Sequence, residues 1–324
     1  LSMFRKLISI GLLSLSCSLF AAGKIPIGDT ETIVLYGDSI TEQNLYTAYI
    51  ETFLLTRLPQ KDLTIYNFGW GGDTAAGGNA RFARDVAPVK PTLVFVNFGM
   101  NDGRYTGPDQ AIFDSYIGSQ KLLADTIKAA GARQVLLTTS PIDYDRRGDK
   151  DLYNDALANM ADGVMALADE GSLPVCDIFH PMRQLQADVK AGRQDYTMIP
   201  DSVHPNAVGH LPMAYYVLRE LDVPGLVGTV AIADGKLKRT EGLAITGFKA
   251  TNDGFECSMS LSCLPFYVPQ SAREALTFVP FQKDLNTFTL TVDGLAPDQR
   301  YLLVVNGVES GGFSAKELAE GADL

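Results

Sequence analysis

Apolar residues in the first two-thirds of the 324-residue chain fall into short, nearly continuous runs, separated by stretches with helical spacing. We expect a strand at each run: 32–36, 63–67, 92–97, 135–139 and 173–178. We expect helices between them at 46–58, 108–130, 152–168 and 206–221. Near-continuous apolar strands that alternate with helices indicate a parallel sheet covered on both faces. The pattern therefore predicts a doubly wound α/β domain, in which ligands bind at the carboxyl ends of the strands.

The pattern changes after Pro224, where short runs with period two replace the α/β alternation. Runs at 287–292 and 301–305 are typical of strands, and Asn306-Gly307 after the second run favours a hairpin. Two further turn dipeptides, Asp253-Gly254 and Asp293-Gly294, punctuate this part of the chain. We therefore predict a β-rich second unit over 225–324. A helix that starts near 314–320 has few residues after it, so we expect this unit to be truncated.

The first residues are typical of a targeting segment. Arg5 and Lys6 precede an apolar run at 8–20, and small residues follow at 21–23. The run is too short to span a bilayer comfortably, so we predict a signal peptide over 1–22, no membrane insertion of the mature chain, and a secreted or periplasmic protein. A lipoprotein signal at Cys17 is the alternative, which we rank lower because Ser14 stands where leucine is usual.

Net charge limits the possible binding partners, and the cysteines bear on disulfide bonding and on the core. The formal net charge is -11 and the pI is about 4.8, which argues against nucleic acid or an anionic membrane as a partner. Cys257 and Cys263 lie six residues apart in a turn-rich stretch. Export would permit a disulfide between them, and two free thiols are the alternative. Cys176 belongs to an apolar run, so we expect it in the core.

Candidate chemistry begins where the first predicted strand ends, in Gly37-Asp38-Ser39. A serine directly after a buried parallel strand lies at the mouth of the sheet, and the helix that follows directs backbone amides toward an anion. A nucleophilic hydroxyl needs this environment. The alternative is that Ser39 only caps the helix.

The next two strand ends carry hydrogen-bond donors. The second is followed by a glycine-rich stretch with Gly69 and Gly72, and glycines let backbone N–H groups approach a ligand. This stretch is not a dinucleotide loop, because Thr74 occupies the position of the third glycine. The third strand is followed by Asn101, whose amide can donate to a developing oxyanion. A turn in which Asn101 satisfies local backbone is the alternative.

The remaining candidate pair is Asp201 and His204, three residues apart in a short loop. An aspartate at this spacing can reach the imidazole, fix its tautomer and stabilise the imidazolium. A solvated polar loop is the alternative. We expect the other two histidines, His180 and His210, to lack such an acidic companion and to be structural, with His210 either packed or at the surface.

Together these residues make the chain resemble the SGNH hydrolases, the GDSL-type lipases and esterases. Four blocks carry the resemblance, in the order of the family: Gly37-Asp38-Ser39, Asn67-x-Gly69-x-x-Gly72, Gly99-x-Asn101-Asp102 and Asp201-x-x-His204. The serine does not stand in a Gly-x-Ser-x-Gly elbow, which disfavours the α/β-hydrolase fold. The resemblance implies a flavodoxin-like three-layer parallel sheet over 23–224, with the β-rich unit as an extension.

The resemblance also implies a serine esterase that works without metal or cofactor. Ser39 would attack the ester, His204 would act as general base and acid, and Asp201 would orient His204. Three donors would form the oxyanion hole: the backbone N–H of Ser39, that of Gly72 and the side chain of Asn101. Asp38 and Asp102 would hold loops.

The resemblance, together with export, suggests a small-molecule or polysaccharide ester as substrate, most often an acetyl group on a carbohydrate. A short-chain lipid or aryl ester is the alternative. Tyr46, Trp70 and Tyr105 flank the motif loops, where aromatic rings can stack on a sugar. For Tyr46, which falls on a predicted helix, ordinary packing is the preferred interpretation.

Two other classes of protein compete with the esterase. One is a metal-dependent phosphoesterase with a ligand set drawn from Asp38, Asn101, Asp102, Asp201 and His204. A single histidine is few for such a site, and Ser39 would have no role. The other is a binding protein that has the same fold, which would not need a nucleophile. The pattern favours the esterase over both.

Overall fold

The computed structural model of the chain describes residues 24–147, 151–251 and 254–324. The predicted signal peptide with Cys17 lies outside these residues, and so does Asp253 of the turn dipeptides. Within the described ranges, no helix has both the length and the apolar character needed to cross a bilayer.

The first part of the chain forms a five-stranded parallel sheet in the order β2-β1-β3-β4-β5. Its strands are β1 (Thr30–Gly37), β2 (Asp62–Gly69), β3 (Leu93–Asn97), β4 (Arg133–Leu137) and β5 (Val175–Cys176). Each overlaps an apolar run from which we predicted a strand, and β4 begins and ends two residues earlier than predicted. Every residue of β3 is buried, as expected for a central strand covered on both faces. The strand order is the flavodoxin-like one, which confirms the predicted fold.

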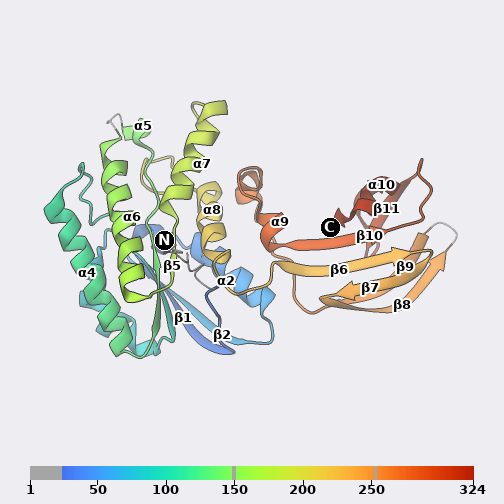
Figure 1. Cartoon of the computed structure of the whole chain (residues 1–324), viewed down its shortest axis with the longest axis horizontal. Coiled ribbons are helices and arrows are strands. Elements are labelled where there is room, and N and C mark those ends of the chain that lie inside the picture. Colours follow the sequence, from blue (N-terminus) through green and yellow to red (C-terminus); the bar gives the residue numbers. More distant parts are fainter. Residues whose placement is uncertain (1–23, 148–150, 252–253) are drawn as a thin grey trace, which may run out of the picture.

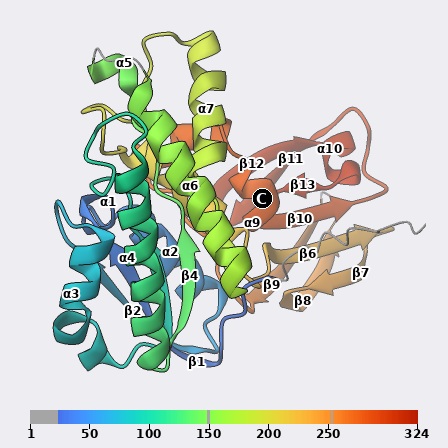
Figure 2. The same cartoon turned by 60° about the vertical axis from the view of Figure 1, so that its left-hand side comes forward.

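Helices cover both faces of this sheet, as Figures 1 and 2 show. On one face lie α2 (Tyr46–Arg57) and α8 (Ala207–Leu218), and on the other lie α3 (Ala75–Asp85), α4 (Gln110–Ala129) and α6 (Leu152–Gly171). The helix α7 (Phe179–Gly192) follows β5. The shorter helices are α1 (Ser39–Glu42), η1 (Ala87–Val89) and α5 (Tyr144–Arg147).

The pattern did not predict α3, and its sequence explains why. The helix contains Gly77 and Gly78, and glycine weakens a helix interior. The hydroxyl of Thr74 caps its first turn by accepting from the backbone N–H of Gly77. Gly78 is needed where it stands, because a Cβ there would lie 2.6 Å from the ring of Phe98. Tertiary packing therefore stabilises a helix that local propensity disfavours.

The residues after Pro224 form the predicted β-rich part. One sheet has the order β13-β10-β6-β7, with β6 (Leu226–Ala233), β7 (Lys236–Glu241), β10 (Thr287–Val292) and β13 (Ala322–Asp323). Two hairpins form separate two-stranded sheets beside it. One pairs β8 (Leu243–Thr251) with β9 (Gly254–Leu261), and the other pairs β11 (Arg300–Val305) with β12 (Val308–Ser314). Asn306 and Gly307 turn the second hairpin with φ of 51° and 80°, as predicted. The helix expected near 314–320 is α10 (Ala315–Glu320), which begins with a capping box.

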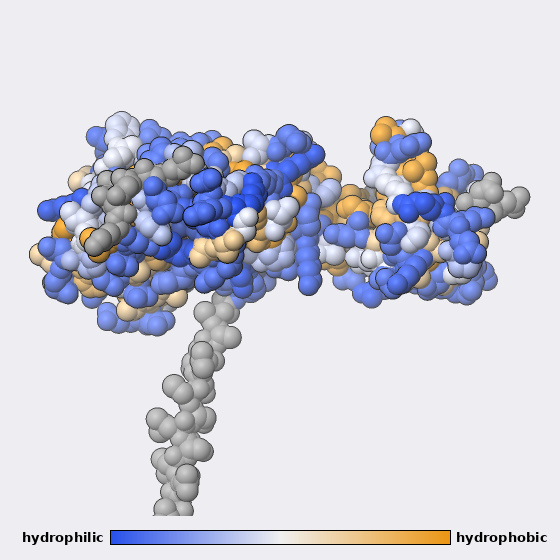
Figure 3. Space-filling view, turned by 90° about the horizontal axis from the view of Figure 1, so that it is seen from above, coloured by the Kyte–Doolittle hydropathy of each residue, from blue (hydrophilic) through white to orange (hydrophobic). Residues whose placement is uncertain are grey.

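Seen from above, the described residues form two lobes (Figure 3). The segment with η2 (Gln270–Thr277) and α9 (Phe281–Leu285) packs on α8 and adds Phe266 and Phe281 to the main core. A smaller, separate core lies among the strands and α10 of the second lobe. The boundary at residue 224 stays a prediction.

One buried side chain ties the two parts together. Arg57, at the end of α2, is 4% exposed and donates to the backbone carbonyls of Leu264 and Leu285 and to the side chain of Asn286. Its guanidinium also donates to the sulfur of Cys263, at 3.7 Å. Cys257 and Cys263 are free thiols in the structure, and Cys176 is fully buried, as predicted.

Candidate active site

Ser39 is the first residue of α1, directly after β1, where the sequence placed it at the mouth of the sheet. Asp38 caps the helix, because its Oδ1 accepts from the backbone N–H of Ile40 at 3.0 Å. A Cβ on Gly37 would lie 2.4 Å from the carbonyl oxygen of Asn97 and 2.2 Å from the hydroxyl of Thr41. Gly37 is therefore required for close packing between neighbouring strand ends, and its φ is not positive.

His204 and Asp201 come together with Ser39 in one hydrogen-bonded chain. The Oγ of Ser39 lies 2.8 Å from Nε2 of His204, and Nδ1 of His204 lies 2.7 Å from Oδ2 of Asp201. Burial raises the pKa of Asp201, but hydrogen bonds from the backbone N–H groups of His204 and Val203 and from the ring lower it by more. Since Asp201 is thus an acceptor, Nδ1 carries the ring proton and Nε2 accepts from the serine hydroxyl.

The expectation that His180 lacks an acidic companion was wrong. Asp177 stands three residues before it, and its Oδ2 lies 2.9 Å from Nδ1 of His180. The local arrangement is the same as that of Asp201 and His204. Nε2 of His180, however, lies 3.4 Å from a carboxylate oxygen of Asp162, whereas Nε2 of His204 faces a hydroxyl. Asp177 also accepts from Thr138, so this pair ties the start of α7 to the end of β4.

His210 is a packing residue, one of the two alternatives that the sequence left open. It is fully buried, stacks on Tyr46 with ring centroids 5.8 Å apart, and accepts from the backbone N–H of Tyr46 through Nδ1. Its Nε2 therefore donates to Oε1 of Gln43, at 2.9 Å. Burial is the largest cause that lowers the pKa of His210 to about 3, so the ring is neutral near pH 7.

The predicted oxyanion-hole residues lie on adjacent loops. Gly72 has a φ of 73°, and no atom lies within 4 Å of the place a Cβ would take, so this side of the loop is open. Asn101 donates through Nδ2 to the carbonyl of Asp73, at 2.8 Å, and accepts through Oδ1 from the hydroxyl of Tyr105, at 3.0 Å. These bonds connect Asn101 to the loop of Gly72 rather than to Ser39.

Arg81 is a site residue that sequence reasoning missed. Its Nε lies 2.6 Å from a carboxylate oxygen of Asp73, and another guanidinium nitrogen donates to the carbonyls of Gly37 and Phe68. The same group lies 4.3 Å from the ring centre of Tyr36. Arg81 thereby joins the ends of β1 and β2 to the Gly72 loop. Nothing in the local pattern distinguishes it from the neighbouring arginine at 84, which is largely exposed.

Two buried carboxyl groups support the same loops. Burial, with a smaller contribution from the charges of Asp102 and Asp73, raises the pKa of Asp38 to about 7. Burial likewise raises the pKa of Asp102 to about 6, and Asp102 accepts from the backbone N–H of Ala75. Each group bonds to backbone near the start of a helix. Among the residues the structure describes, no three acidic, histidine or cysteine side chains converge as metal ligands do.

The three aromatic residues named from the sequence differ in exposure. Tyr46 is 1% exposed and its hydroxyl bonds to that of Thr41, so it packs inside the protein. Trp70 is 61% exposed and stands beside the Gly72 loop. Tyr105 is 36% exposed, and its ring lies against Tyr153 with centroids 5.0 Å apart. Trp70 is therefore the ring that a ligand can reach best.

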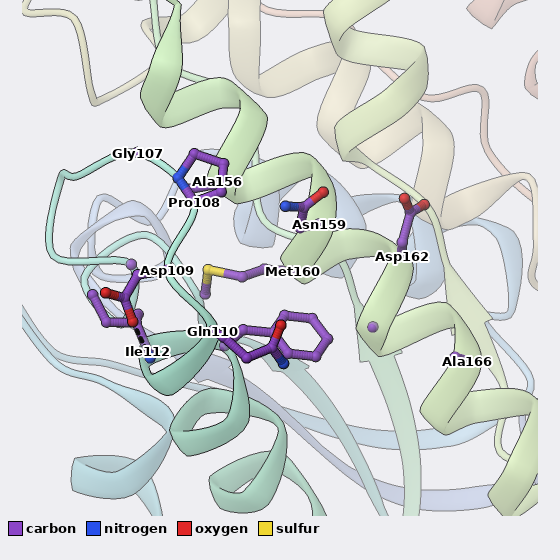
Figure 4. Close-up of a pocket in the computed structure, with 13 residues that line it drawn as sticks. Gly107, Pro108, Asp109, Gln110, Ile112, Ala156, Asn159, Met160, Asp162 and Ala166 are labelled. Atoms are coloured by element: carbon purple, nitrogen blue, oxygen red, sulfur yellow. Dashed lines mark hydrogen bonds between the residues drawn. The ribbon is translucent and has the colours of Figure 1, made fainter.

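A cavity of about 570 Å³ lies between α4 and α6 (Figure 4). Two of the polar side chains that line it have local partners: Asp109 accepts from the backbone N–H of Ile112 and caps α4, and Gln110 donates to Asp114. Ser39, Asp201 and His204 do not line it. The cavity is thus separate from the hydrogen-bonded chain at Ser39.

The fold and the four blocks agree with a family comparison. The profile of the GDSL-like lipase/acylhydrolase family matches residues 35–211, more than half of the chain. The chain belongs to this family, that of the SGNH hydrolases, and it is a carboxylic ester hydrolase.

Two individual relatives match parts of this chain. The chain is 26% identical to an acetylxylan esterase of Geobacillus stearothermophilus over 219 residues, which cover 60% of this chain and 95% of that protein. It is 35% identical to esterase TesA of Pseudomonas aeruginosa over 111 residues, 33% of this chain and 53% of TesA.

Solved structures extend the likeness. A gut microbial diltiazem-metabolizing enzyme matches with a TM-score of 0.83 and 25% identity, over 93% of this chain and 74% of that one. A catalytic mutant of the G. stearothermophilus acetylxylan esterase matches with a TM-score of 0.53 and 23% identity, over 61% and 97% of the two chains, and shows the fold. The first match therefore includes much of the sequence after Pro224.

Proposed function

We propose that Ser39, His204 and Asp201 are the catalytic triad of this ester hydrolase. The observation that carries the proposal is the hydrogen-bonded chain from Ser39 Oγ through His204 to Asp201. His204 takes the serine proton as Oγ attacks the acyl carbon, and then gives it to the leaving alcohol. Water, activated by the same imidazole, releases the acid and restores the serine. Asp201 holds the ring in the required tautomer and stabilises its charged form.

The backbone N–H groups of Ser39 and Gly72 and the side chain of Asn101 form the oxyanion hole in this proposal. The free space where a Cβ on Gly72 would stand supports it, because no neighbouring side chain fills that side of the loop. An asparagine amide has two N–H donors, and the carbonyl of Asp73 accepts from only one of them. The other is the donor to the oxyanion.

The proposed substrate is a short acyl ester, an acetyl group, on a neutral carbohydrate. The acetylxylan esterase relative supports it, because the match covers 95% of that protein. The exposed ring of Trp70 beside the Gly72 loop supports it too, since sugars stack on aromatic rings. A small aryl or lipid ester is the second candidate, favoured by the structural likeness to a diltiazem-metabolizing enzyme. A polysaccharide substrate outside the cell would agree with the signal peptide predicted at 1–22.

The first experiment compares p-nitrophenyl acetate, butyrate and octanoate on residues 23–324. We expect acetate to be cleaved fastest, EDTA to change nothing, and Ser39→Ala to lose activity. His204→Ala should lose it as well, whereas His180→Ala, a change in the matching Asp-x-x-His pair, should keep it. Wild-type activity in Ser39→Ala would refute the triad, and loss with EDTA would favour the metal-dependent alternative.

The substrate class needs a second experiment. Acetylated xylo-oligosaccharide is compared with p-nitrophenyl acetate in wild type and in Trp70→Ala. If the ring binds sugar, KM for the oligosaccharide rises while both constants for p-nitrophenyl acetate stay the same. If the oligosaccharide is not deacetylated although p-nitrophenyl acetate is cleaved, the carbohydrate proposal is wrong and the small-ester candidate takes its place.

A further inference from the structure

The loop after β3 has an unusual backbone. Arg104 and Tyr105 are consecutive non-glycine residues in the left-handed region, with φ of 54° and 55°. Residues other than glycine rarely adopt this conformation, and it persists where surrounding contacts hold it. Here backbone hydrogen bonds from Gly103 to Gly99 and from Arg104 to Asn101 close the turn. The Tyr105 hydroxyl adds a contact with the side chain of Asn101, four residues earlier. The backbone thus folds back on the proposed oxyanion-hole residue.

The amide of Asn101 is held from both ends. The hydroxyl of Tyr105 donates to Oδ1 at 3.0 Å, and the carbonyl of Asp73 accepts from Nδ2 at 2.8 Å. Turning the amide by 180° would bring Oδ1 against the Asp73 carbonyl, two acceptors that cannot bond to each other. The Asp73 carbonyl therefore excludes the turned orientation, and the Tyr105 hydroxyl, which can donate or accept, holds the oxygen end of the amide in place.

Tyr105 is itself supported from α6. Its ring lies 5.0 Å from that of Tyr153, with an interplanar angle of 36°. The hydroxyl of Tyr153 donates to the carbonyl of Met100, the residue before Asn101. A Cβ on Gly103 would lie 2.6 Å from that hydroxyl, so the loop passes close to the tyrosine. One buried side chain thus holds both the backbone before Asn101 and the ring of Tyr105.

We propose that Tyr105 is a positioning residue that orients the Asn101 amide, so that Nδ2 faces the acyl oxygen during ester hydrolysis. The proposal rests on the oxyanion role proposed for Asn101. Tyr105 lies outside the four sequence blocks, and its hydroxyl acts through Asn101 rather than on the reacting atoms. One face of its ring is taken by Tyr153, so its contribution is orientation rather than stacking on a sugar.

The test is Tyr105→Phe, which keeps the ring against Tyr153 and removes only the hydroxyl. A neutral hydrogen bond of ordinary net strength predicts a fall in kcat of roughly 2- to 12-fold, with KM for p-nitrophenyl acetate unchanged. The melting temperature should stay within a degree or two of wild type, since the hydroxyl is at the surface. Tyr66→Phe is the matched control, because Tyr66 is 38% exposed and its ring stacks on Phe68; it should leave kcat unchanged.

A double-mutant cycle separates this proposal from the proposed function. Asn101→Ala alone should lower kcat by about 10²–10³, and adding Tyr105→Phe to it should lower kcat no further. An equal fall from Tyr105→Phe in both backgrounds would overturn the positioning role, because the hydroxyl would then act elsewhere. So would a normal kcat in Tyr105→Phe when Asn101→Ala is impaired. A normal kcat in Asn101→Ala would refute the oxyanion role itself, and the positioning role with it.

Discussion

Asp38 should make the stability of this protein depend on pH near neutrality. Its side chain is buried between β1 and α1, at 2% exposed, and accepts from the backbone N–H of Ile40. Burial, with a smaller contribution from the nearby charges of Asp102 and Asp73, raises its pKa from 3.8 to about 7. Between these two pH values, Asp38 thus keeps its proton in the folded protein but has released it in the unfolded chain.

The sign of the effect follows from linkage. Between pH 3.8 and about 7 the folded state binds more protons than the unfolded state at this position, so stability falls as pH rises through that window. Each pH unit of the interval is worth about 1.36 kcal/mol, so the whole interval corresponds to about 4 kcal/mol. The contribution is fully present below pH 3.8 and is lost above about 7. Because Asp102 titrates nearby, the two carboxyls share this change.

Asp38→Asn keeps the shape and the helix cap but cannot ionise. The free energy of unfolding of Asp38→Asn minus that of wild type should therefore grow by about 4 kcal/mol from pH 4 to pH 8. Urea titrations at steps of one pH unit measure it. Asp38→Ala is the control for the helix cap. Its free energy of unfolding should be lower than that of Asp38→Asn by about 0.5–2 kcal/mol, and by the same amount at each pH. A difference between Asp38→Asn and wild type that does not change with pH would show that Asp38 has an ordinary pKa in the folded protein, contrary to this prediction.

Three other predictions concern stability. Arg57→Met should lower the free energy of unfolding by about 2–6 kcal/mol in a denaturant titration, since the carbonyls of Leu264 and Leu285 lose their donor at about 1–3 kcal/mol each; an unchanged midpoint would contradict it. Gly69→Ala should lower both the melting temperature and ester hydrolysis, because its Cβ would lie 2.1 Å from the backbone nitrogen of Glu42, whereas Gly72→Ala should cost only about 1–2 kcal/mol for its positive φ. As the pH falls from 6.5 toward 3, His210 gains a proton in the unfolded chain but not in the folded protein, so wild type should lose about 5 kcal/mol of stability. His210→Gln should not show this loss.

The sequence pattern predicted the elements whose local and tertiary preferences agree. The five apolar runs became the strands of the parallel sheet, and Asn306-Gly307 turned the hairpin. The pattern did not show α3, whose glycines disfavour a helix locally, or α7, which has a proline in its first turn. In both helices, buried side chains such as Phe82 and Met182 supply the stabilisation, and burial depends on neighbours that are distant in the chain.

The reason Gly37 is a glycine also depended on the fold. A glycine at the end of a strand often marks a tight turn. In the structure its φ is not positive, and the restriction comes from Thr41 and the carbonyl of Asn97, which belongs to the neighbouring strand. Arg81 is a similar case, because its partners lie at the ends of two different strands. Local periodicity carries no information about which strand ends become neighbours.

By itself the sequence determined the α/β alternation, the four blocks and the pairing of Asp201 with His204, since a carboxylate three residues before a histidine can reach its ring within one turn of chain. Asp177 and His180 have the same spacing and the same local hydrogen bond. Only the tertiary structure decided that Nε2 of His204 meets the hydroxyl of Ser39, 165 residues away, and that Nε2 of His180 meets a carboxylate. The order of strands in the sheet determines which loop lies beside the end of β1. That order depends on the burial of apolar side chains over the whole domain.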